Sequence, residues 1–229
     1  LDMTLMPLNA MRRLPHVLTS CLLVSLASLT GCQIDGAEPP LVNFGKATPL
    51  TIEVPANLPP ITIPPENPTT VQGVALGRKL FYEPLLSAGN SQSCGSCHAQ
   101  AYAFSDNGRR FSEGVDGSIG DMNAMAIVNL AWANEFFWDG RTVGIEEQAR
   151  LPVINPIEMH ETWPNAIAKL QATTTYPVMF QAAFGTDKIT EDLAVKAIAQ
   201  FERSMISGNS DYDKFMRGES NGMTQAAYR

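Results

Sequence analysis

The sequence predicts a mostly α-helical domain with long loops, extending over residues 70–229. Apolar side chains recur there at the spacing of amphipathic helices, and no convincing run of alternating strand residues interrupts them. Upstream, nine prolines between residues 39 and 68 prevent any long helix. A helical domain of this length can bury a real hydrophobic core.

The first two expected helices lie on either side of a long loop region. After Thr70, one apolar face is formed by Val71, Ala75, Leu76 and Leu80. Further along the chain, Thr142 and the acidic pair Glu146-Glu147 form a start signal. They predict a short helix that extends through Arg150.

A longer helix is expected to begin at the sequence Thr190-Glu191-Asp192, whose first residue is a favourable cap. Its apolar side carries Leu193, Ala197, Ile198, Phe201 and Met205. Gly208 ends this pattern. Asp211 is then expected to cap a last short helix, which extends to Arg217.

The N-terminal residues have the features of a lipoprotein signal peptide. Met11-Arg12-Arg13 supplies positive charge, and residues 17–29 form an apolar run that is too short to span a bilayer. Leu29-Thr30-Gly31-Cys32 has the form of a lipoprotein cleavage box, which predicts removal of residues 1–31 and a lipid on the sulfur of Cys32. Residues 1–10 precede a better start at Met11, so we expect them to lie outside the translated protein. An ordinary secretory signal with a coincidental cysteine is the alternative.

The residue after the cleavage box favours a particular location. Gln33 is not the aspartate that tends to retain lipoproteins at the inner membrane of Gram-negative bacteria. We therefore expect an anchor in the outer membrane, with the protein facing the periplasm. Residues 32–69 then form an extended, Pro-rich tether, part of which can also lie across the domain surface.

The charge of the chain bears on its partners. The net charge of −7 argues against nucleic acid, because that partner requires clustered Lys and Arg. The acidic residues are scattered, so charge gives only weak support for a basic redox partner.

Cys94-Gly95-Ser96-Cys97-His98 is the most informative stretch, because C-x-x-C-H is the attachment sequence of a c-type haem. The two thiols are spaced to add across the two vinyl groups of one porphyrin, and His98 follows as the proximal ligand of the iron. This predicts a cytochrome c-like haem domain with one covalent haem. A zinc site would need further ligands, and the other cysteines, Cys21 and Cys32, lie in the signal segment. An unmodified redox pair would need an α/β pattern around it.

Other motifs accompany the haem sequence: Leu76-Gly77-Arg78-Lys79-Leu80-Phe81-Tyr82 before it, then Phe136-Phe137-Trp138-Asp139-Gly140-Arg141, Glu146-Glu147-Gln148-Ala149, Asn155-Pro156-Ile157-Glu158-Met159 and Phe201-Glu202-Arg203. Their order resembles that of bacterial di-haem cytochrome c peroxidases, the family that includes MauG-type enzymes. The resemblance covers residues 70–229, the N-terminal, peroxidatic half of the family's architecture. A second C-x-x-C-H should follow a segment like residues 223–229, so we expect a chain truncated before the second haem domain.

The resemblance implies catalytic or electron-transfer roles for three residues. Glu158 matches the family's distal catalytic glutamate, and Gln148 matches the glutamine that orients peroxide or water above the iron. Trp138 matches the tryptophan that carries electrons between the two haems. The structural alternatives are a helix-start carboxylate, a solvated amide and a core aromatic, respectively.

Two further residues are implied as ligands or partners of cofactors. Arg141 pairs either with a haem propionate or with Asp139, since a guanidinium suits a carboxylate. Asn123 stands where the family has an asparagine that binds an interdomain calcium. Four other aromatic residues are expected to fill the core: Trp132, Phe136, Phe137 and Trp163.

One departure from the family concerns the loop after the haem motif. Many members hold the resting haem inactive with a histidine in this loop, whereas residues 114–120 contain none, so we expect an open iron. The alternatives for His160 are a sixth ligand, a distal proton donor or an exposed loop residue. Met122, Met125 and Met159 are either weak thioether ligands or core-filling residues.

Three functions compete for this set of residues. The first is a peroxidase that reduces hydrogen peroxide with electrons from a small cytochrome c or cupredoxin, delivered through the second haem. The second is MauG-like oxidation of a side chain on a partner protein. The third is a mono-haem electron carrier, which would need a clear distal methionine and no Glu-Gln pair. A homodimer and a membrane contact through the lipid anchor complete the expected partners.

Overall fold

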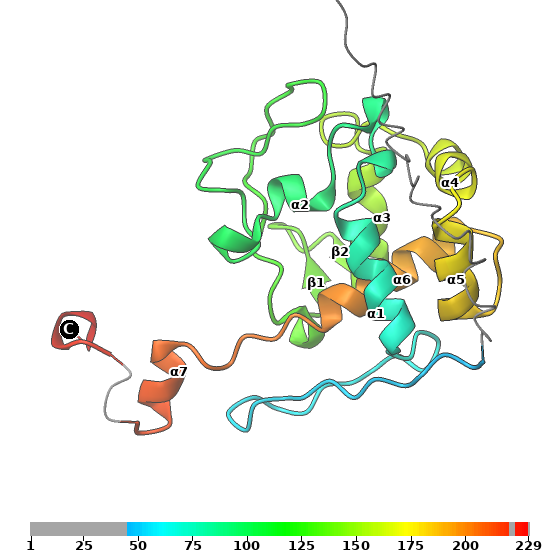
Figure 1. The fold of residues 1–229 in the computed structure, drawn as a ribbon. Coiled ribbons are helices and arrows are strands. Elements are labelled where there is room, and N and C mark those ends of the chain that lie inside the picture. Colours follow the sequence, from blue (N-terminus) through cyan, green and yellow to red (C-terminus); the bar gives the residue numbers. More distant parts are fainter. Residues whose placement is uncertain (1–44, 220–222, 229) are drawn as a thin grey trace, which may run out of the picture. The chain divides into compact units, whose positions relative to one another are not determined.

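The structure of this protein is a computed structural model that describes residues 45–219 and 223–228. It is mostly helical, as the sequence predicts (Figure 1). The α-helices are α1 (Val71–Phe81), α2 (Cys94–Cys97), α3 (Ile145–Ile154), α4 (Trp163–Gln171), α5 (Tyr176–Phe184), α6 (Glu191–Arg203), α7 (Asp211–Met216) and α8 (Gln225–Tyr228). Four 3₁₀ turns cover Pro84–Leu86, Ala88–Asn90, Gln100–Tyr102 and Leu130–Trp132, and the short strands β1 (Glu135–Phe136) and β2 (Thr142–Val143) pair antiparallel. Cys32 and the expected signal segment lie outside the described residues.

Helices α1 and α6 cross at the centre of the fold (Figure 1). Two glycines of α1 permit this close approach. A methyl group at Gly73 would collide with the side chain of Gln200, and one at Gly77 would collide with the backbone carbonyl of Ala197. Thr70 starts α1 as its cap, because its hydroxyl accepts a hydrogen bond from the Gly73 amide at 3.0 Å. The crossing therefore requires backbone to approach backbone without intervening side chains.

The hydrophobic core forms three clusters, of which the smallest contains Phe136, Ile145 and Ala199. The largest cluster joins α1 to α4, α5 and α6, and its fully buried members include Leu76, Leu80, Leu170, Phe180, Val195 and Ile198. The second cluster contains Phe81, Ile127 and Phe201, and the side chain of Cys94 packs against it. The second cluster thus connects the helical core to the C-x-x-C-H motif.

The structure corrects the buried face of α1 and the start of α3. Val71 and Ala75 are exposed, because the glycine face of α1 is the one that packs on α6. Helix α3 begins at Ile145 and continues past Arg150 to its end at Ile154. Thr142, expected as part of a helix start, lies instead in strand β2.

The C-terminal helices follow the sequence prediction with two changes. Thr190 caps α6, since its hydroxyl accepts a hydrogen bond from the Leu193 amide at 3.3 Å. Helix α6 ends at Arg203, so Met205 lies beyond it. Ser210, rather than Asp211, caps α7 by accepting a hydrogen bond from the Asp213 amide at 3.2 Å.

Residues 45–69 contain no helix, as expected, and part of this segment packs on the domain. Asn67 is only 2% exposed and donates a hydrogen bond to Glu146 Oε1 at 2.6 Å. Gln200 Nε2 donates to Asn67 Oδ1 at 2.8 Å, and Arg203 Nη2 donates to Glu146 Oε1 at 2.7 Å. The segment is therefore fixed to α3 and α6, while a tether role for the Pro-rich region stays a prediction.

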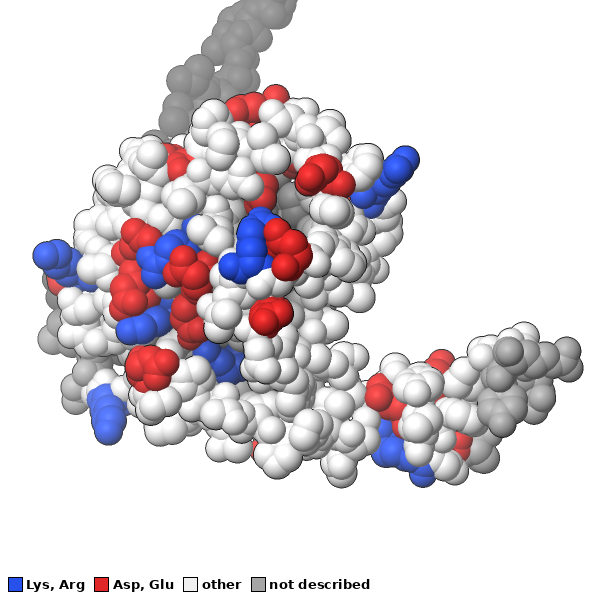
Figure 2. Space-filling view, turned by 180° about the vertical axis from the view of Figure 1, so that it is seen from behind, with Lys and Arg blue, Asp and Glu red and all other residues white. Residues whose placement is uncertain are grey.

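Charged side chains of both signs are interspersed on the face seen from behind (Figure 2). On α3 and α6 the structure pairs Arg150 with Glu147 and Glu191, and Lys196 with Asp192. Exposed pairs of this kind contribute at most about 1 kcal/mol each, so the core dominates stability. Within residues 45–219 and 223–228, no helix has the length and apolar character needed to cross a membrane.

The helix crossing generates a stability prediction for Gly77→Ala. The added methyl group collides with the Ala197 carbonyl, so we expect a loss of about 1–3 kcal/mol in the free energy of unfolding. Alanine is intrinsically the better helix former by roughly 1 kcal/mol, so a net loss isolates the collision. Denaturant unfolding followed by circular dichroism measures the change.

Gly45→Ala is the matched control for this substitution. A methyl group at Gly45 has no neighbour within 4 Å, so we expect a change within about 0.5 kcal/mol. Equal stability of the two variants would show that the α1–α6 approach is looser than the structure indicates.

Candidate functional site

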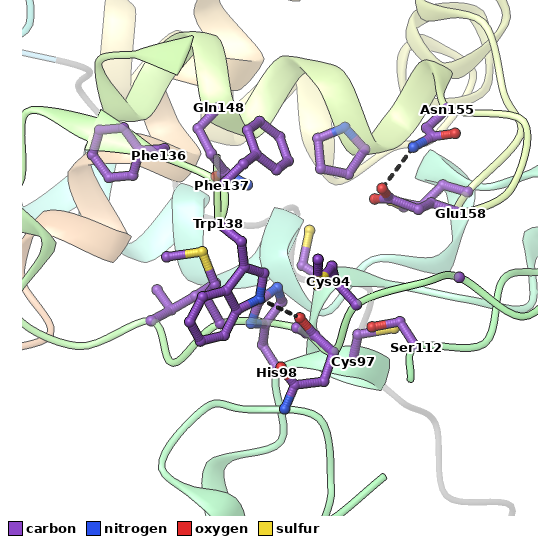
Figure 3. Close-up of a pocket in the computed structure, with 18 of the residues that line it drawn as sticks. Cys94, Cys97, His98, Ser112, Phe136, Phe137, Trp138, Gln148, Asn155 and Glu158 are labelled. Carbon is purple, nitrogen blue, oxygen red and sulfur yellow. Dashed lines mark hydrogen bonds between the residues drawn. The ribbon is translucent and has the colours of Figure 1, made fainter. Parts of the chain in front are cut away.

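A cavity of about 510 Å³ lies between α2 and α3 (Figure 3). Cys94, Cys97 and His98 line one wall, while Gln148 and Glu158 line the wall that faces them. Arg141, Trp138 and Asn123 are also among the lining residues, so the cavity gathers every site residue predicted within the described part of the chain. Its volume falls in the range of about 300–1,000 Å³ that is usual for ligand and cofactor sites.

The C-x-x-C-H motif folds as a single helical turn. Ser93 and Ser96 form a capping box at the start of α2, with the Ser93 amide donating to Ser96 Oγ at 3.0 Å. The His98 amide donates to the Cys94 carbonyl at 2.9 Å, so the turn continues into the histidine. This local geometry places both sulfurs and the imidazole on the same cavity wall.

The orientation of His98 depends on the main chain that follows it. Ala103 and Phe104 adopt left-handed conformations with φ of 55° and 57°, which cost about 1–3 kcal/mol each in non-glycine residues. The Phe104 carbonyl oxygen lies 2.9 Å from Nδ1 of His98. Burial lowers the pKa of His98, which favours the neutral ring. A neutral imidazole that donates from Nδ1 leaves Nε2 as the metal ligand.

The two thiols suit covalent attachment better than ionisation. Desolvation is the main cause that raises the pKa of Cys94 to about 12 and that of Cys97 to about 11. A thioether has no proton to lose, so the burial that opposes a thiolate does not oppose a thioether. The sulfurs, the imidazole and the cavity in front of them therefore fit a covalently attached haem.

The facing wall carries a carboxyl group with a fixed orientation. Asn155 Nδ2 donates to Glu158 Oε1 at 2.7 Å (Figure 3), and Asn155 Oδ1 accepts from the Ile157 amide at 3.1 Å. Burial raises the pKa of Glu158 above its ordinary value, although the Asn155 hydrogen bond and the Arg141 charge oppose the shift. Gln148 extends from α3 along the same wall. A carboxyl with a raised pKa can exchange a proton with a molecule in the cavity.

Residues 112–122 form a loop that supports Glu158 from outside. Glu113 and Ile119 form an antiparallel bridge within it, and the Val115 amide donates to the Glu158 carbonyl at 2.8 Å. Gly114 approaches the backbone so closely that a methyl group there would collide with the Ile157 carbonyl. The histidine-free loop thus fixes the main chain of the residue that carries the distal carboxyl.

Trp138 and Asn123 are in direct contact at the cavity. Trp138 Nε1 donates to the Asn123 carbonyl at 3.0 Å (Figure 3), and Trp138 is 61% exposed. Trp138 is therefore not a buried core aromatic. Electron transfer through Trp138 and calcium binding at Asn123 stay predictions, and the described residues contain no group of three or more His, Cys, Asp or Glu side chains suited to a metal ion.

Arg141 pairs with Asp139, which is one of its two expected partners. Its Nη1 lies 2.9 Å from Asp139 Oδ1, and its guanidinium lies 3.7 Å from the centroid of the Phe137 ring. A contact with a haem propionate stays a prediction. Phe136 and Trp163 are buried as expected, and both Phe136 and Phe137 line the cavity.

His160 is exposed and does not line the cavity. Its Nδ1 lies 2.6 Å from Asp116 Oδ2, and both side chains are about half exposed. Of its alternatives, the exposed loop residue is the one that the geometry supports. The sulfur-bearing residues Met122, Met125 and Met159 do line the cavity, with Met159 buried and Met122 exposed.

Sequence reasoning missed three groups that shape the site. Asn155 stands three residues before Glu158, a spacing that suggests a side-chain contact across one turn. The Phe104 carbonyl belongs to the main chain, so no side-chain pattern in the sequence indicates it. Glu202 is 2% exposed at the cavity, and its Oε2 has no hydrogen-bond partner within the part of the chain that the structure describes. Burial, followed by the charge of Glu146, raises the pKa of Glu202 to about 8.

A helical turn with two sulfurs and an imidazole, opposite a partly buried carboxyl, defines a c-type haem domain with an acid–base group on its far wall. Comparison with known proteins narrows this class. The family model of di-haem cytochrome c peroxidase matches residues 71–221, and the chain belongs to that family. Membership implies haem c as the cofactor.

The relatives include both branches of the family. Cytochrome c peroxidase Ccp of Escherichia coli (strain K12) is 40% identical over 173 residues, which cover 73% of this chain and 36% of the relative. Methylamine utilization protein MauG of Methylophilus methylotrophus is 31% identical over 183 residues, which cover 76% of this chain and 54% of the relative. The crystal structure of a MauG-like protein associated with microbial copper homeostasis has a TM-score of 0.71 and 33% identity, and the match covers 77% of this chain and 52% of the other. The chain thus spans between about a third and about half of the length of these relatives.

The buried Glu202 carboxyl generates a prediction about stability and pH. Its folded pKa of about 8 lies above the unfolded value of about 4.3, so the folded chain keeps a proton that the unfolded chain has already lost. The free energy of unfolding therefore falls as pH rises through this window, by up to roughly 1.4 kcal/mol for each pH unit. Glu202→Gln removes this contribution. We therefore expect the free energy of unfolding of the variant to rise relative to that of the unchanged protein as the pH increases from 5 to 8.

Denaturant unfolding of the haem-loaded protein at several pH values measures the difference. Asp187→Asn alters an exposed carboxyl and serves as the control for the loss of one carboxyl group. Parallel stability curves for Glu202→Gln and the unchanged protein would contradict a neutral buried carboxyl.

Proposed function

We propose that this domain is the peroxidatic site of an enzyme that reduces hydrogen peroxide to water. The observation that carries the proposal is the Glu158 carboxyl, held by Asn155 on the wall that faces the C-x-x-C-H turn. Cleavage of a peroxide O–O bond needs a group that takes a proton from one oxygen and returns it to the other. The similarity to a cytochrome c peroxidase supports the same reaction for the longer protein to which this domain corresponds.

Residues on the two walls of the cavity have different roles. Haem c, when bound, supplies an iron that binds peroxide and exchanges electrons. His98 offers Nε2 to the iron, while the Phe104 carbonyl holds Nδ1. Glu158 accepts and returns the proton through the oxygen that Asn155 does not engage. Gln148 orients peroxide or water from α3.

Electrons are proposed to arrive through Trp138 from a second haem, which a small periplasmic cytochrome c or cupredoxin reduces. The 61% exposure of Trp138 supports this role, because the indole contacts the cavity on one side and solvent on the other. A simple mono-haem electron carrier is the weaker proposal, since the Glu158 and Gln148 pair has no use in it.

A second candidate is MauG-like oxidation of a side chain on a partner protein. Similarity to MauG and to a MauG-like structure favours it. The two functions differ in what peroxide oxidises. Rapid oxidation of a reduced small cytochrome supports the peroxidase, whereas peroxide-dependent modification of a partner protein without cytochrome oxidation supports the MauG-like reaction.

The location of the protein forms a separate part of the proposal. The cleavage box that ends at Cys32 supports a lipid anchor in the outer membrane, facing the periplasm. Cys32→Ser should release the protein into the soluble periplasmic fraction, because the lipid has no other attachment site. Fractionation with N-terminal sequencing measures this, and a soluble unchanged protein with a different N-terminus would exclude the anchor.

Glu158→Gln tests the catalytic assignment directly. The amide keeps the size of the side chain and cannot take up a proton, so we expect peroxide cleavage to slow by about 10²- to 10⁴-fold. In the unchanged protein the rate should also fall as pH decreases through the raised pKa of Glu158, because the protonated carboxyl cannot act as a base. Stopped-flow spectroscopy of the haem-loaded protein measures both effects.

Glu147→Gln is the matched control, since that exposed carboxylate lies on α3 next to Gln148. It should leave the rate and its pH profile unchanged. Covalent haem, measured as the pyridine haemochrome, should be equal in all three proteins. A Glu158→Gln protein with unchanged peroxide kinetics would defeat the assignment.

A further inference from the structure

Tyr82 lies in contact with both the haem motif and solvent. It follows α1 directly and is 41% exposed. Its ring packs against Gly95, where an added methyl group would be 2.5 Å from Cδ1 and 2.6 Å from Cε1 of the ring. Since Gly95 lies between Cys94 and Cys97, the phenol ring contacts the helical turn that carries both haem-attachment cysteines.

A second line of contacts connects Tyr82 with the proximal histidine. The ring of Phe81 is fully buried and packs edge-on against Tyr82, with centroids 5.1 Å apart. The same Phe81 ring lies 6.4 Å from the imidazole of His98. The tyrosine thus reaches the motif through the Gly95 backbone and the imidazole through one aromatic ring.

Other tyrosines differ from Tyr82 in the features that matter for electron loss. Tyr102 and Tyr212 are more exposed, at 49% and 60%, but Tyr102 packs against Gly108 and Tyr212 lies on the remote helix α7. Tyr176 is buried, and the ammonium of Lys79 lies 5.4 Å from its ring centroid. A cation over the ring opposes the positive charge that oxidation would create there.

We propose that Tyr82 is a one-electron oxidation site, which gives an electron from the protein surface to the haem centre during the reaction with peroxide. The inference rests on the proposed function, because peroxide is the oxidant. Reduction of hydrogen peroxide to two water molecules consumes two electrons and two protons. Without an external donor the haem centre supplies one electron and Tyr82 the other. The phenolic O–H bond breaks, its proton passes to solvent water, and a neutral tyrosyl radical remains at the surface.

The fate of this radical is a chemical signature. A small reductant in solution returns the electron and restores the phenol. In its absence, radicals on two copies of the chain form a carbon–carbon bond between ring carbons adjacent to the oxygens. The ring hydrogens then move to the oxygens, which gives dityrosine with no change in the number of atoms.

The test uses the haem-loaded protein, treated with hydrogen peroxide in the presence of a nitroso spin trap. Tandem mass spectrometry then locates the covalent adduct, and electron paramagnetic resonance records the radical. We expect the adduct on the Tyr82 peptide, with loss of that adduct and of dityrosine fluorescence in Tyr82→Phe. Phenylalanine keeps the ring against Phe81 and Gly95, and the pyridine haemochrome checks that haem attachment is unchanged. Tyr102→Phe and Tyr212→Phe are the controls and should retain the Tyr82 adduct.

A parallel reaction with an organic peracid separates this inference from the proposed function. The carboxylate that leaves a peracid is a better leaving group than hydroxide. Cleavage of the peracid O–O bond therefore depends less on Glu158. Labelling of Tyr82 by the peracid but not by hydrogen peroxide would uphold the oxidation site and count against the peroxidase. A haem spectrum that responds to hydrogen peroxide, with no Tyr82 adduct from either oxidant, would overturn the oxidation site and leave the peroxidase standing. Adducts distributed by exposure, strongest on Tyr212, would also overturn it.

Discussion

The close crossing of α1 and α6 is the contact on which the rest of the domain depends. Gly77 meets the backbone of Ala197, so at this point the two helices approach each other without a side chain between them. Phe81 at the end of α1 therefore packs on Phe201, with ring centroids 5.3 Å apart. From there Phe81 reaches the haem motif, and Glu202 faces the cavity one residue beyond Phe201. A single helix crossing thus builds one side of the haem cavity.

The polar network around Asn67 supports the facing side. Arg203 of α6 and Glu146 of α3 are joined at 2.7 Å, and Asn67 bonds to the same carboxylate. Arg203 is buried, so removing Glu146 would leave the guanidinium charge without compensation. Since α3 also carries Gln148, the residues before the helical domain help to hold the distal wall at its distance from α2.

The sequence predicted those parts of the site whose chemistry demands neighbouring residues. Covalent attachment requires Cys94, Cys97 and His98 within one turn, and the structure places them on one wall. Glu158 was accessible only through its resemblance to a family motif, because a lone glutamate carries no local signal of catalysis. On α1, Leu76 and Leu80 are buried as predicted, whereas Val71 and Ala75 are exposed, since apolar periodicity gives no weight to glycines that pack backbone on backbone. The Phe104 carbonyl is a main-chain group, and side-chain patterns do not report it.

The Phe104 carbonyl has a consequence for which substitutions can alter the proximal hydrogen bond. The partner of His98 Nδ1 is a peptide oxygen, not a carboxylate or an amide side chain. Every amino acid carries the same oxygen, so no substitution at position 104 replaces this acceptor with a charged one. The direction of the carbonyl depends instead on the left-handed conformations of Ala103 and Phe104. The charge around the site is open to change through the side chains that line the cavity, Glu202 among them.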